Sequence, residues 1–478
     1  MFDGLKKNPH RFRPVKFKEL EEKGLVRPAR PRRRTKTGKK PVLSWESRNE
    51  KIRISSPLRS RRKLLLLIGI PFVLILTIWV VLSQSYFIQL VRLALSLHQQ
   101  TLLVGFQNSA ELRPTGGFWG SFALWDIKNN LGESELIFET NPYKTDNLIL
   151  RESAAELPSP MKETWPTRPQ SFVNANWALD FPEAAKTLEW YFGQGWGKKT
   201  DAVVAVSSLA MIDLLKITGP ISSGDSTEIS ADNFTQVMSQ KIDTEYWLNP
   251  ANVAENEPKT ILKELAPLII NKVKQIPKLQ LYRFFITQLR QGRILLFFND
   301  SKRQKIVEKM AATGQLAAEK VDYLLINNAN LNGGKTSLNV DQMISYEVKE
   351  AEGNLAHLEI TRTHREEWPE ILNRNYTRVA APLGTKLVSA TLAGEDITQG
   401  VQTSDESGKT TFGFWFSVSP GEAKTATLEY ELPFQLQSKR AYKLTVQKQP
   451  GTNPDELKIT VFGKTLFQGA NKQSTLEF

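Results

Sequence analysis

Hydrophobic residues in this chain follow three patterns, and each pattern predicts a different kind of structure. The first is a run of nineteen residues without a charged side chain, LLLLIGIPFVLILTIWVVL (64–82). As a helix rising about 1.5 Å per residue, this run would reach roughly 28 Å, close to the hydrocarbon thickness of a bilayer. A single helix also pairs its own backbone amides and carbonyls, as lipid requires. Residues 64–82 are therefore predicted to form a transmembrane helix.

A cleaved signal peptide fits this run poorly. Its apolar core is too long, 63 residues precede it, and the SQSYFIQLV that follows has no small-x-small cleavage pattern. Residues 83–100 then keep apolar side chains at helical spacing beside a polar face. We expect an uncleaved signal anchor (64–82) followed by a helical stalk (83–100).

The second pattern covers residues 101–320, where apolar runs typical of buried strands alternate with segments typical of helices. The expected strands are 101–108, 118–127, 135–140, 200–206 and 293–300. The expected helices lie within 172–192 and at 207–221, 231–247, 258–276, 278–292 and 301–314, and a Pro-rich passage at 157–169 is expected to be an irregular loop. This alternation predicts an α/β domain with a mixed, largely parallel sheet and helices on both faces.

The third pattern begins near residue 320, where apolar and polar residues alternate with period two. The expected strands are 323–331, 345–352, 357–364, 375–382, 386–394, 410–419, 424–432, 441–449 and 457–463. Many short strands at regular spacing predict an antiparallel, sandwich-like all-β domain. The expected organisation is a tail (1–63), the anchor (64–82), the stalk (83–100), the α/β domain (101–320), a connecting β segment (321–370) and the β-sandwich-like domain (371–478).

Positive charge is concentrated in the tail. Residues 1–63 hold 22 Lys and Arg against 6 Asp and Glu, which gives +16; the whole chain carries +13, so residues 64–478 carry −3. Lys and Arg beside a span stay on the cytoplasmic side, so we expect a single-pass cell-membrane protein with a cytoplasmic N-terminus and an extracytoplasmic bulk. The tail cannot bury enough apolar surface to fold alone, and it is expected to be disordered beside anionic lipid. No nucleic-acid partner is expected, because no RNA-binding motif or aromatic interleaving accompanies the charge.

Composition also narrows the possible chemistry. The chain has no cysteine and four histidines, so disulfides, thiol catalysis and Cys zinc sites are excluded. It has no G-x-S-x-G elbow, P-loop, dinucleotide glycine fingerprint or HExxH motif. These absences disfavour a serine hydrolase, a P-loop or Rossmann nucleotide enzyme, and a zinc peptidase.

The unusual stretch is FQNSAELRPTGGFWGSF (106–122), in which a strand ends and a loop presents Arg113. A guanidinium is a rigid fork of donors suited to phosphate or carboxylate, and Gly116 and Gly117 let backbone approach closely. Ligands commonly bind at the carboxyl ends of parallel strands. Two interpretations remain open: Arg113 clamps a phosphate, or it forms an ion pair with a local carboxylate inside a tight turn.

Neighbouring loops supply acidic and amide residues as candidate partners for a ligand. These are Asn108, Glu111, Asp146, Asn174, Asn176 and Asp180. Mg²⁺ takes oxygen ligands from one or two carboxylates together with a substrate phosphate, so Asp146 and Asp180 are the candidate metal ligands. Both are also residue types that cap helices and turns. Asp180 in particular stands before Pro182 and Glu183, which is typical of a helix start.

Several segments together resemble the bacterial membrane family known as domain of unknown function 4012. They are LLVGFQNSAELRPTGGFWGSFALWDI, NANWALDFPEAAKTLEWYF and DAVVAVSSLAMIDLLKITGPI, with NYTRVAAPLGTKL and YKLTVQKQPGT nearer the C-terminus. The resemblance spans roughly residues 100–465. Members often carry Arg-Asp where this chain has Val173-Asn174.

The order of elements is similar, more distantly, to the LytR–CpsA–Psr family of envelope phosphotransferases. That resemblance implies transfer of a glycopolymer from a polyprenyl-pyrophosphate carrier to peptidoglycan, with Mg²⁺ and several Arg. Arg113 corresponds to the Arg that follows the first strand in that family, and Asp146 lies near the position of its Pro-Arg-Asp motif. This chain has Asn108 where the family has a metal-binding Asp.

Two functions are therefore expected from the sequence. In the first, the α/β domain of a membrane-anchored envelope protein binds or transfers a lipid-linked, (pyro)phosphorylated glycan, with Arg113 and Asp146 as tentative catalytic residues. In the second, the protein is a non-catalytic envelope scaffold or adhesion protein that uses its β-sandwich for binding.

Overall fold

The structure is a computed structural model that describes residues 85–129, 133–139, 141–149, 155–248, 250, 253, 259–318, 321–349, 354–434 and 442–478. All of these residues lie in one compact unit, Pro71–Phe478. The expected tail (1–63) and transmembrane helix (64–82) lie outside the described residues. Among the described residues, no helix is long and apolar enough to cross a membrane.

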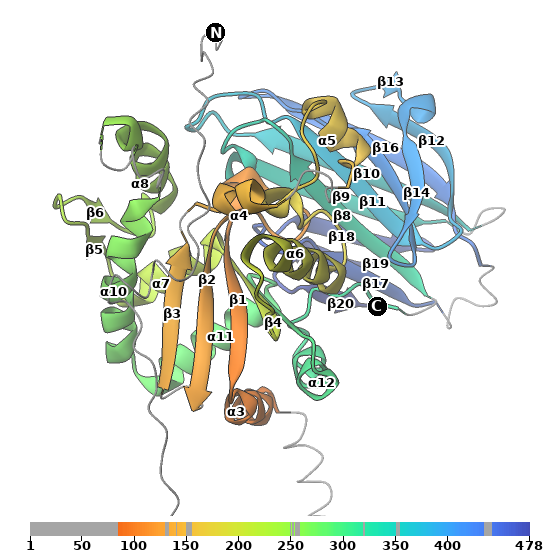
Figure 1. Cartoon of the computed structure of the whole chain (residues 1–478). Helices are drawn as coiled ribbons and strands as arrows, with labels where there is room; N and C mark the ends of the chain where they lie inside the picture. Colours follow the sequence, from red (N-terminus) through yellow and green to blue (C-terminus); the bar gives the residue numbers. More distant parts are fainter. Residues whose placement is uncertain are drawn as a thin grey trace, which may run out of the picture. The chain divides into compact units, whose positions relative to one another are not determined.

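A five-stranded sheet forms the first part of the described chain (Figure 1). Its strand order is β3 (Glu133–Glu139), β2 (Phe118–Asn129), β1 (Gln100–Asn108), β4 (Ala202–Ser207) and β7 (Ile294–Phe298). Only β1 and β4 pair in parallel, whereas the other three pairs are antiparallel. The mixed sheet is as predicted, but the expectation of a largely parallel sheet is wrong. The nine residues between β1 and β2 are too few for a parallel crossover, which needs a dozen or more.

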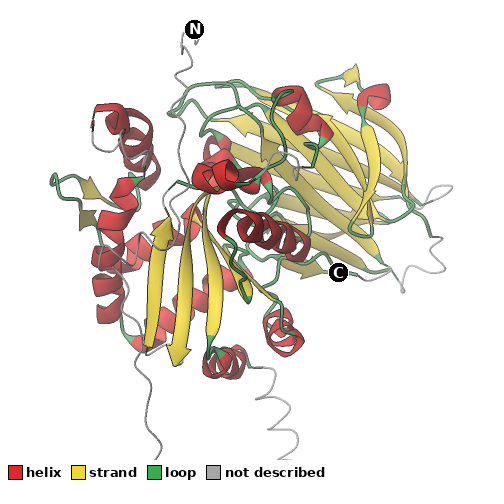
Figure 2. Cartoon of the chain, in the orientation of Figure 1, coloured by secondary structure: helices red, strands yellow, loops and turns green. Residues whose placement is uncertain are grey.

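Helices cover both faces of this sheet, as predicted (Figure 2). On one face, Leu188 and Phe192 of α6 (Phe181–Trp196) pack against Leu103 and Phe122. On the other face, alternate strand residues pack against helices that come from the beginning and from the later part of the α/β sequence. These helices are α3 (Tyr86–Ser96), α7 (Ser208–Thr218), α11 (Lys278–Arg290) and α12 (Ser301–Lys309).

Shorter elements surround the sheet. They are α4 (Tyr143–Leu148), α5 (Ser159–Thr164), the 3-10 turns η1 (Ser109–Glu111) and η3 (Phe172–Asn174), β5 (Ile221–Ser222), β6 (Glu228–Ile229) and α10 (Thr260–Gln275). The expected helix 231–247 is divided into α8 (Phe234–Ser239), a π turn η4 (Gln240–Thr244) and a 3-10 turn η5 (Glu245–Leu248). The expected loop 157–169 contains α5, which begins after Pro158 and has Pro160 in its first turn, where proline is tolerated.

The rest of the described chain is built from β-sheets, as predicted. One sheet has six strands in the order β14 (Gln402–Glu406), β15 (Lys409–Trp415), β11 (Asn375–Pro382), β8 (Asp322–Asn330), β17 (Leu444–Lys448) and β20 (Thr475–Glu477). The other has seven strands in the order β13 (Glu395–Asp396), β12 (Lys386–Leu392), β16 (Ala423–Glu431), β10 (Leu355–His364), β9 (Val340–Val348), β18 (Glu456–Val461) and β19 (Lys464–Ala470). The 3-10 turns η6 (Ser337–Asn339) and η7 (Thr398–Gly400) lie between strands.

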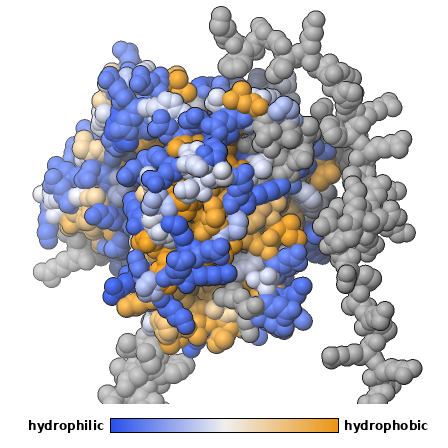
Figure 3. All heavy atoms as spheres, turned by 90° about the vertical axis from the view of Figure 1, so that its left-hand side faces the viewer, coloured by the Kyte–Doolittle hydropathy of each residue, from blue (hydrophilic) through white to orange (hydrophobic). Residues whose placement is uncertain are grey.

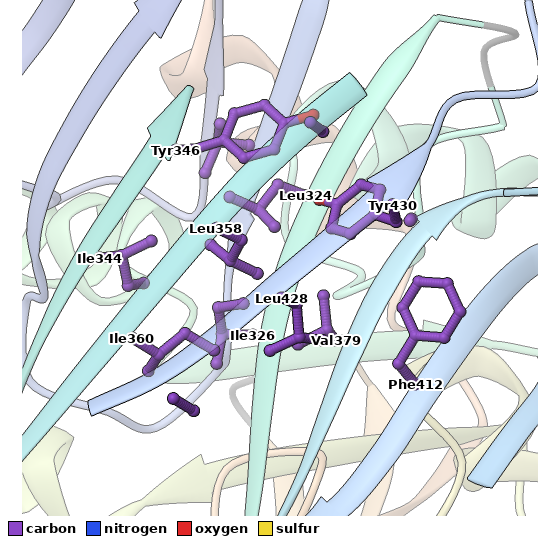
Figure 4. Close-up of a cluster of buried hydrophobic side chains, with 14 of the residues drawn as sticks. Leu324, Ile326, Ile344, Tyr346, Leu358, Ile360, Val379, Phe412, Leu428 and Tyr430 are labelled. Carbon is purple, nitrogen blue, oxygen red and sulfur yellow. The ribbon is translucent and has the colours of Figure 1, made fainter. Parts of the chain in front are cut away.

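These two sheets share one hydrophobic core (Figure 4). Leu324, Val379 and Phe412 reach it from the six-stranded sheet, and Leu358 and Tyr430 reach it from the seven-stranded sheet. Strands β8, β9 and β10, from the expected connecting segment 321–370, lie inside these sheets. Two pairs, β17 with β8 and β18 with β9, are parallel, so the sheets are mainly but not entirely antiparallel.

Candidate anion site at the end of strand β1

The loop after β1 begins with a locally capped turn. The Asn108 side chain accepts a hydrogen bond from the amide of Ala110 at 3.1 Å, and its amide nitrogen donates to Glu111 Oε1 at 3.1 Å. Asn is a favoured capping residue because its short side chain reaches the free backbone amides of the turn. Two of the expected site residues, Asn108 and Glu111, are therefore in contact with each other.

Gly116 and Gly117 make the close backbone approach that the sequence suggests, but the approach is to the chain itself. A Cβ on Gly117, at φ +152°, would stand 2.5 Å from the carbonyl carbon and oxygen of Asn108. A Cβ on Gly451, between β17 and β18, would stand 2.1 Å from Gly116 O. Only glycine fits at these positions without a clash with backbone atoms.

Residues 113–117, the RPTGG loop, join the α/β part to the β-sheets. Asn176 Nδ2 donates to Thr115 Oγ1 at 3.0 Å and to Gly117 O at 2.8 Å. From the β-sheets, Asn327 Nδ2 donates to Pro114 O at 3.0 Å and Gln449 Nε2 donates to Arg113 O at 3.1 Å. These contacts are buried, so the RPTGG loop holds the α/β part and the β-sheets together.

Arg113 is buried in this joint and is only 4 % exposed. Its NH1 group donates to the carbonyls of Leu112 and Asn330, and its buried Nε has no hydrogen-bond partner among the described residues. Its guanidinium carbon stands 5.6 Å from the Phe118 ring centroid. Burial lowers the pKa of Arg113, and the nearby Glu111 opposes that shift. The alternative of a turn held by an Arg113–carboxylate ion pair is not observed among the described residues.

A second cation, Lys259, approaches the same aromatic ring from the start of α10. Its ammonium donates to Gly120 O and stands 5.9 Å from the Phe118 ring centroid. The residue keeps some exposure, but the ammonium is enclosed, and this burial lowers its pKa from 10.5 to about 8. No described carboxylate comes within ion-pair distance of Lys259 or Arg113.

The surroundings of these two cations complete what we call the cation cluster: Arg113, Lys259, Phe118, Glu111 and Tyr143. The rings of Phe118 and Tyr143 lie 6.4 Å apart. Lys335 forms an ion pair with Asp243 of η4. Its nearby positive charge also lowers the pKa of Lys259. The nearby carboxylates are engaged elsewhere, Glu111 with Asn108 and Asp243 with Lys335. Two buried cations beside them form an environment that favours an anion.

The remaining predicted site residues have structural roles nearby or elsewhere. Asp146 accepts from the amide of Phe172 at 2.7 Å and so caps η3, and burial raises its pKa to about 6. Asp180 caps α6 through Glu183 N and also accepts from Leu316 N at 2.9 Å, so the expected cap is confirmed. Asn174 is buried within η3.

These roles bear on the expected Mg²⁺ site. Asp146 and Asp180 both accept hydrogen bonds from backbone amides, and this is the work of a cap. Within the part of the chain that the structure describes, no three His, Cys, Asp or Glu side chains gather as a metal site. These residues do not fit a magnesium ion, and we derive no step through one.

Sequence reasoning identified Arg113 and Glu111 of the cation cluster, together with the neighbouring Asn108, and missed Lys259, Phe118 and Tyr143. Arg113, Glu111 and Asn108 stand in one short stretch, and their proximity is local. Lys259 lies in an ordinary helix start about 150 residues later, and no motif marks it. Phe118 and Tyr143 were recognisable in the sequence only as aromatic residues, and such residues more often pack in a core than line a binding site.

Comparison with known proteins gives one family. Residues 98–242 match the family described as protein of unknown function DUF4012. No curated protein matches the chain. These matched residues include the RPTGG loop and strands β1 to β4.

Solved structures resemble only a part of the chain. A candidate nutrient-binding protein from Legionella pneumophila shares 8 % identity with a TM-score of 0.19, over 25 % of this chain and 50 % of that one. The M1 zinc metallopeptidase from Deinococcus radiodurans shares 16 % identity with a TM-score of 0.14, over 26 % of this chain and 30 % of that one. This chain thus covers half or less of either protein, and similarities this low carry no argument about fold or function.

Proposed function

We propose that this chain, which carries a DUF4012 domain at residues 98–242, is a single-pass membrane-anchored envelope protein that binds a lipid-linked, phosphorylated glycan. The cation cluster would receive the phosphate. The proposal is limited to binding, because the described carboxylates that the sequence suggests for transfer chemistry, Asp146 and Asp180, cap a turn and a helix.

The observation that carries the proposal is the pair of buried cations without an ion-pair partner among the described residues. Burying a charge without compensation costs several kcal/mol, and a bound anion offsets that cost. Arg113 and Lys259 both stand within 6 Å of the Phe118 ring centroid, so one phosphate or pyrophosphate group placed beside that ring would face both. Their donors are those that phosphate prefers.

An apolar surface beside the cluster supports a ligand with a lipid part. Phe106 and Phe138 stack at 5.9 Å on the sheet face that α3 and α12 cover, and both keep some exposure together with Trp125. Figure 3 faces the side of α8, α10 and β3 and shows apolar side chains gathered over its middle. Exposed apolar residues of these elements include Leu136, Ile137, Leu268 and Ile270. A polyprenyl chain is a fitting occupant for such a surface.

The test uses the full chain in detergent and a polyprenyl pyrophosphate as the probe. Lys259→Gln removes the charge with little change in volume and should weaken binding about tenfold or more, because a charge-assisted contact contributes roughly 1.5–3 kcal/mol. Lys274→Gln is the matched control, since Lys274 lies on the same helix and is exposed. Equal affinity of wild type and Lys259→Gln would contradict the site, and a folded wild type that binds nothing would contradict the function.

A second candidate function is favoured by the RPTGG loop. Its buried contacts to Asn327 and Gln449 connect the α/β part to the β-sheets. This structural role accounts for the loop without a ligand. A non-catalytic envelope scaffold that binds partners through the β-sandwich-like region is therefore the alternative. In that case, the folded wild type ignores the polyprenyl pyrophosphate, while Gly117→Ala still destabilises the protein.

A further inference from the structure

Helix α3 presents an apolar stripe that the rest of the described chain does not cover. Phe87, Val91 and Leu95 are 54 %, 38 % and 68 % exposed, and their spacing of four places them along one side of the helix. The opposite side carries Leu93, which is buried against the sheet, with Leu97 just past the helix end. The packing of α3 on the protein thus leaves this stripe facing outward.

Contacts at both ends hold α3 in a fixed orientation. Near its start, the Phe87 and Tyr282 rings meet edge to face at 5.7 Å, and Arg290 stands 4.4 Å from the Tyr86 ring centroid. At its end, Arg303 of α12 donates to Ser96 O through Nε at 3.1 Å and NH2 at 2.8 Å. These contacts orient α3 so that the stripe faces outward.

Positive charge surrounds the stripe. Helices α3, α11 and α12 together contain eight Lys or Arg residues and a single acidic residue, Glu308, although residues 64–478 carry −3 as a whole. Arg92, Arg283, Lys302 and Lys305 among them are exposed. An apolar stripe flanked by Lys and Arg is the pattern of a helix that lies in a membrane interface.

The sequence also indicates that α3 lies close to the bilayer. Only residues 83–85 separate the uncharged run 64–82 from the first residue of α3. Three residues reach at most about 11 Å when fully extended. If 64–82 spans the bilayer, α3 cannot leave its vicinity.

We propose that the stripe of Phe87, Val91 and Leu95 docks on the bilayer that the anchor crosses, in contact with anionic phospholipid. This inference rests on the anchor in the proposed function, but not on the cation cluster. The cation cluster lies at the opposite end of β1 from α3, and the nine residues of this strand span roughly 30 Å. Docking of α3 therefore also sets the distance of the cation cluster from the bilayer.

The absence of cysteine makes a direct test possible. Val91→Cys and Leu95→Cys in the full chain each accept one environment-sensitive dye, and Val388→Cys, an exposed apolar position on β12, is the matched control. In vesicles with phosphatidylglycerol, the dyes at 91 and 95 should shift to the blue and be quenched by nitroxide-labelled lipid, whereas the dye at 388 should not. A second variant, Lys302→Gln with Lys305→Gln, should reduce the difference between phosphatidylglycerol and pure phosphatidylcholine vesicles.

Each other outcome overturns the inference in a distinguishable way. Water-like, unquenched signals at 91 and 95 in a membrane-retained chain reject the lipid contact and leave phosphate binding unaffected. Energy transfer between labelled copies, without lipid quenching, indicates that a second copy covers the stripe. Release of the chain by alkaline carbonate rejects both the anchor and the docking, while loss of polyprenyl pyrophosphate binding rejects only the proposed ligand.

Discussion

The charge of Lys259 in the cation cluster depends on its surroundings. Burial lowers its pKa to about 8, so the free protein loses this positive charge as the pH rises through 8. We expect the affinity for a phosphorylated ligand to fall between pH 7 and pH 9 in the wild type. Lys259→Arg should remove most of this decline, because a guanidinium stays charged. Titrations at pH 7, 8 and 9 measure the effect, and an identical decline in Lys259→Arg would show that another group titrates.

At Gly117, adding a single methyl group should cost considerable stability. In Gly117→Ala, the new Cβ meets the backbone of Asn108 and Ser109 at 2.5–2.8 Å, and the backbone keeps its positive φ. Clash and strain together should lower the free energy of unfolding by about 2–5 kcal/mol. Gly197→Ala, with φ +63° and no atom within 4 Å, should cost only about 1 kcal/mol. Urea unfolding compares the two, and equal losses would mean that the close approach is not rigid.

At the residue scale, sequence reasoning succeeded where partners are close along the chain. Asp180 caps α6 through Glu183, three positions away, and its residue type predicted this cap. Asn108 caps a turn just as locally, through Ala110, although the sequence suggested it only as a ligand partner. Arg113 meets Asn330 and Gln449, which are 217 and 336 positions distant. No local pattern distinguishes an Arg that faces a ligand from one that a distant strand buries.

At the scale of elements, strand positions were predictable and strand pairings were not. The period-two pattern located β8 to β12 and β15 to β18 within a few residues, because alternation reports which side of a strand is buried. It missed β13, β14, β19 and β20, whose side chains are mostly exposed or half-exposed and so do not alternate clearly. Strands β4 and β7 are separated by 86 residues. The path of those residues decides the pairing, and the sequence of neither strand indicates it.

Asp322 at the start of β8 links elements of both sheets through its carboxylate. Tyr346 of β9 donates to Asp322 Oδ2 at 2.7 Å, and Tyr442, just before β17, also donates to it. Burial outweighs these bonds and raises the pKa of Asp322 to about 6. A carboxyl group with a raised native pKa contributes stability below the unfolded pKa of 3.8, and that contribution is lost as the pH rises through about 6.

We therefore expect the free energy of unfolding to fall between pH 4 and pH 7, with Asp322 contributing up to about 3 kcal/mol of the change. Asp146 and Asp455, whose pKa values burial also raises to about 6, add to the same trend. Asp322→Asn should flatten the curve in part, and Asp232→Asn, at an exposed position, should leave it unchanged. Urea unfolding at each pH measures this, and an Asp322→Asn curve parallel to the wild type would contradict it.

At the scale of the whole molecule, an ion pair between a buried Arg and a half-buried Glu joins the two parts of the described chain. Arg378 of β11 donates to Glu406 Oε2 at 2.7 Å and to Trp177 O at 2.8 Å, and Glu406 Oε1 accepts from Leu179 N at 2.9 Å. The guanidinium also lies over the Trp177 ring. Two hydrogen bonds around this ion pair therefore join the β-sheets to the segment before α6.

Removing the charge on Glu406 should loosen this joint. In Glu406→Gln, the buried Arg378 loses its counter-charge, and the free energy of unfolding should fall by about 2–4 kcal/mol. Glu422→Gln at the more exposed Lys424 ion pair should change it by less than about 1 kcal/mol. Calorimetry of the full chain should show one transition in the wild type. Two transitions in the wild type would mean that the two parts unfold independently despite their contacts.

The parallel pairs formed by β17 and β18 have a consequence for the order of events during synthesis. Each of these strands adds to one of the two sheets and carries the last strand of that sheet, β20 or β19, at its outer side. The turn between β17 and β18 holds Gln449 and Gly451 against the RPTGG loop. The loop is made more than 300 residues before its binding partner emerges. A chain that is still being synthesised must keep its earlier strands unaggregated until this last segment arrives. Loss of that segment would leave both halves incomplete, so a shortened chain is expected to be degraded rather than to survive as a folded fragment.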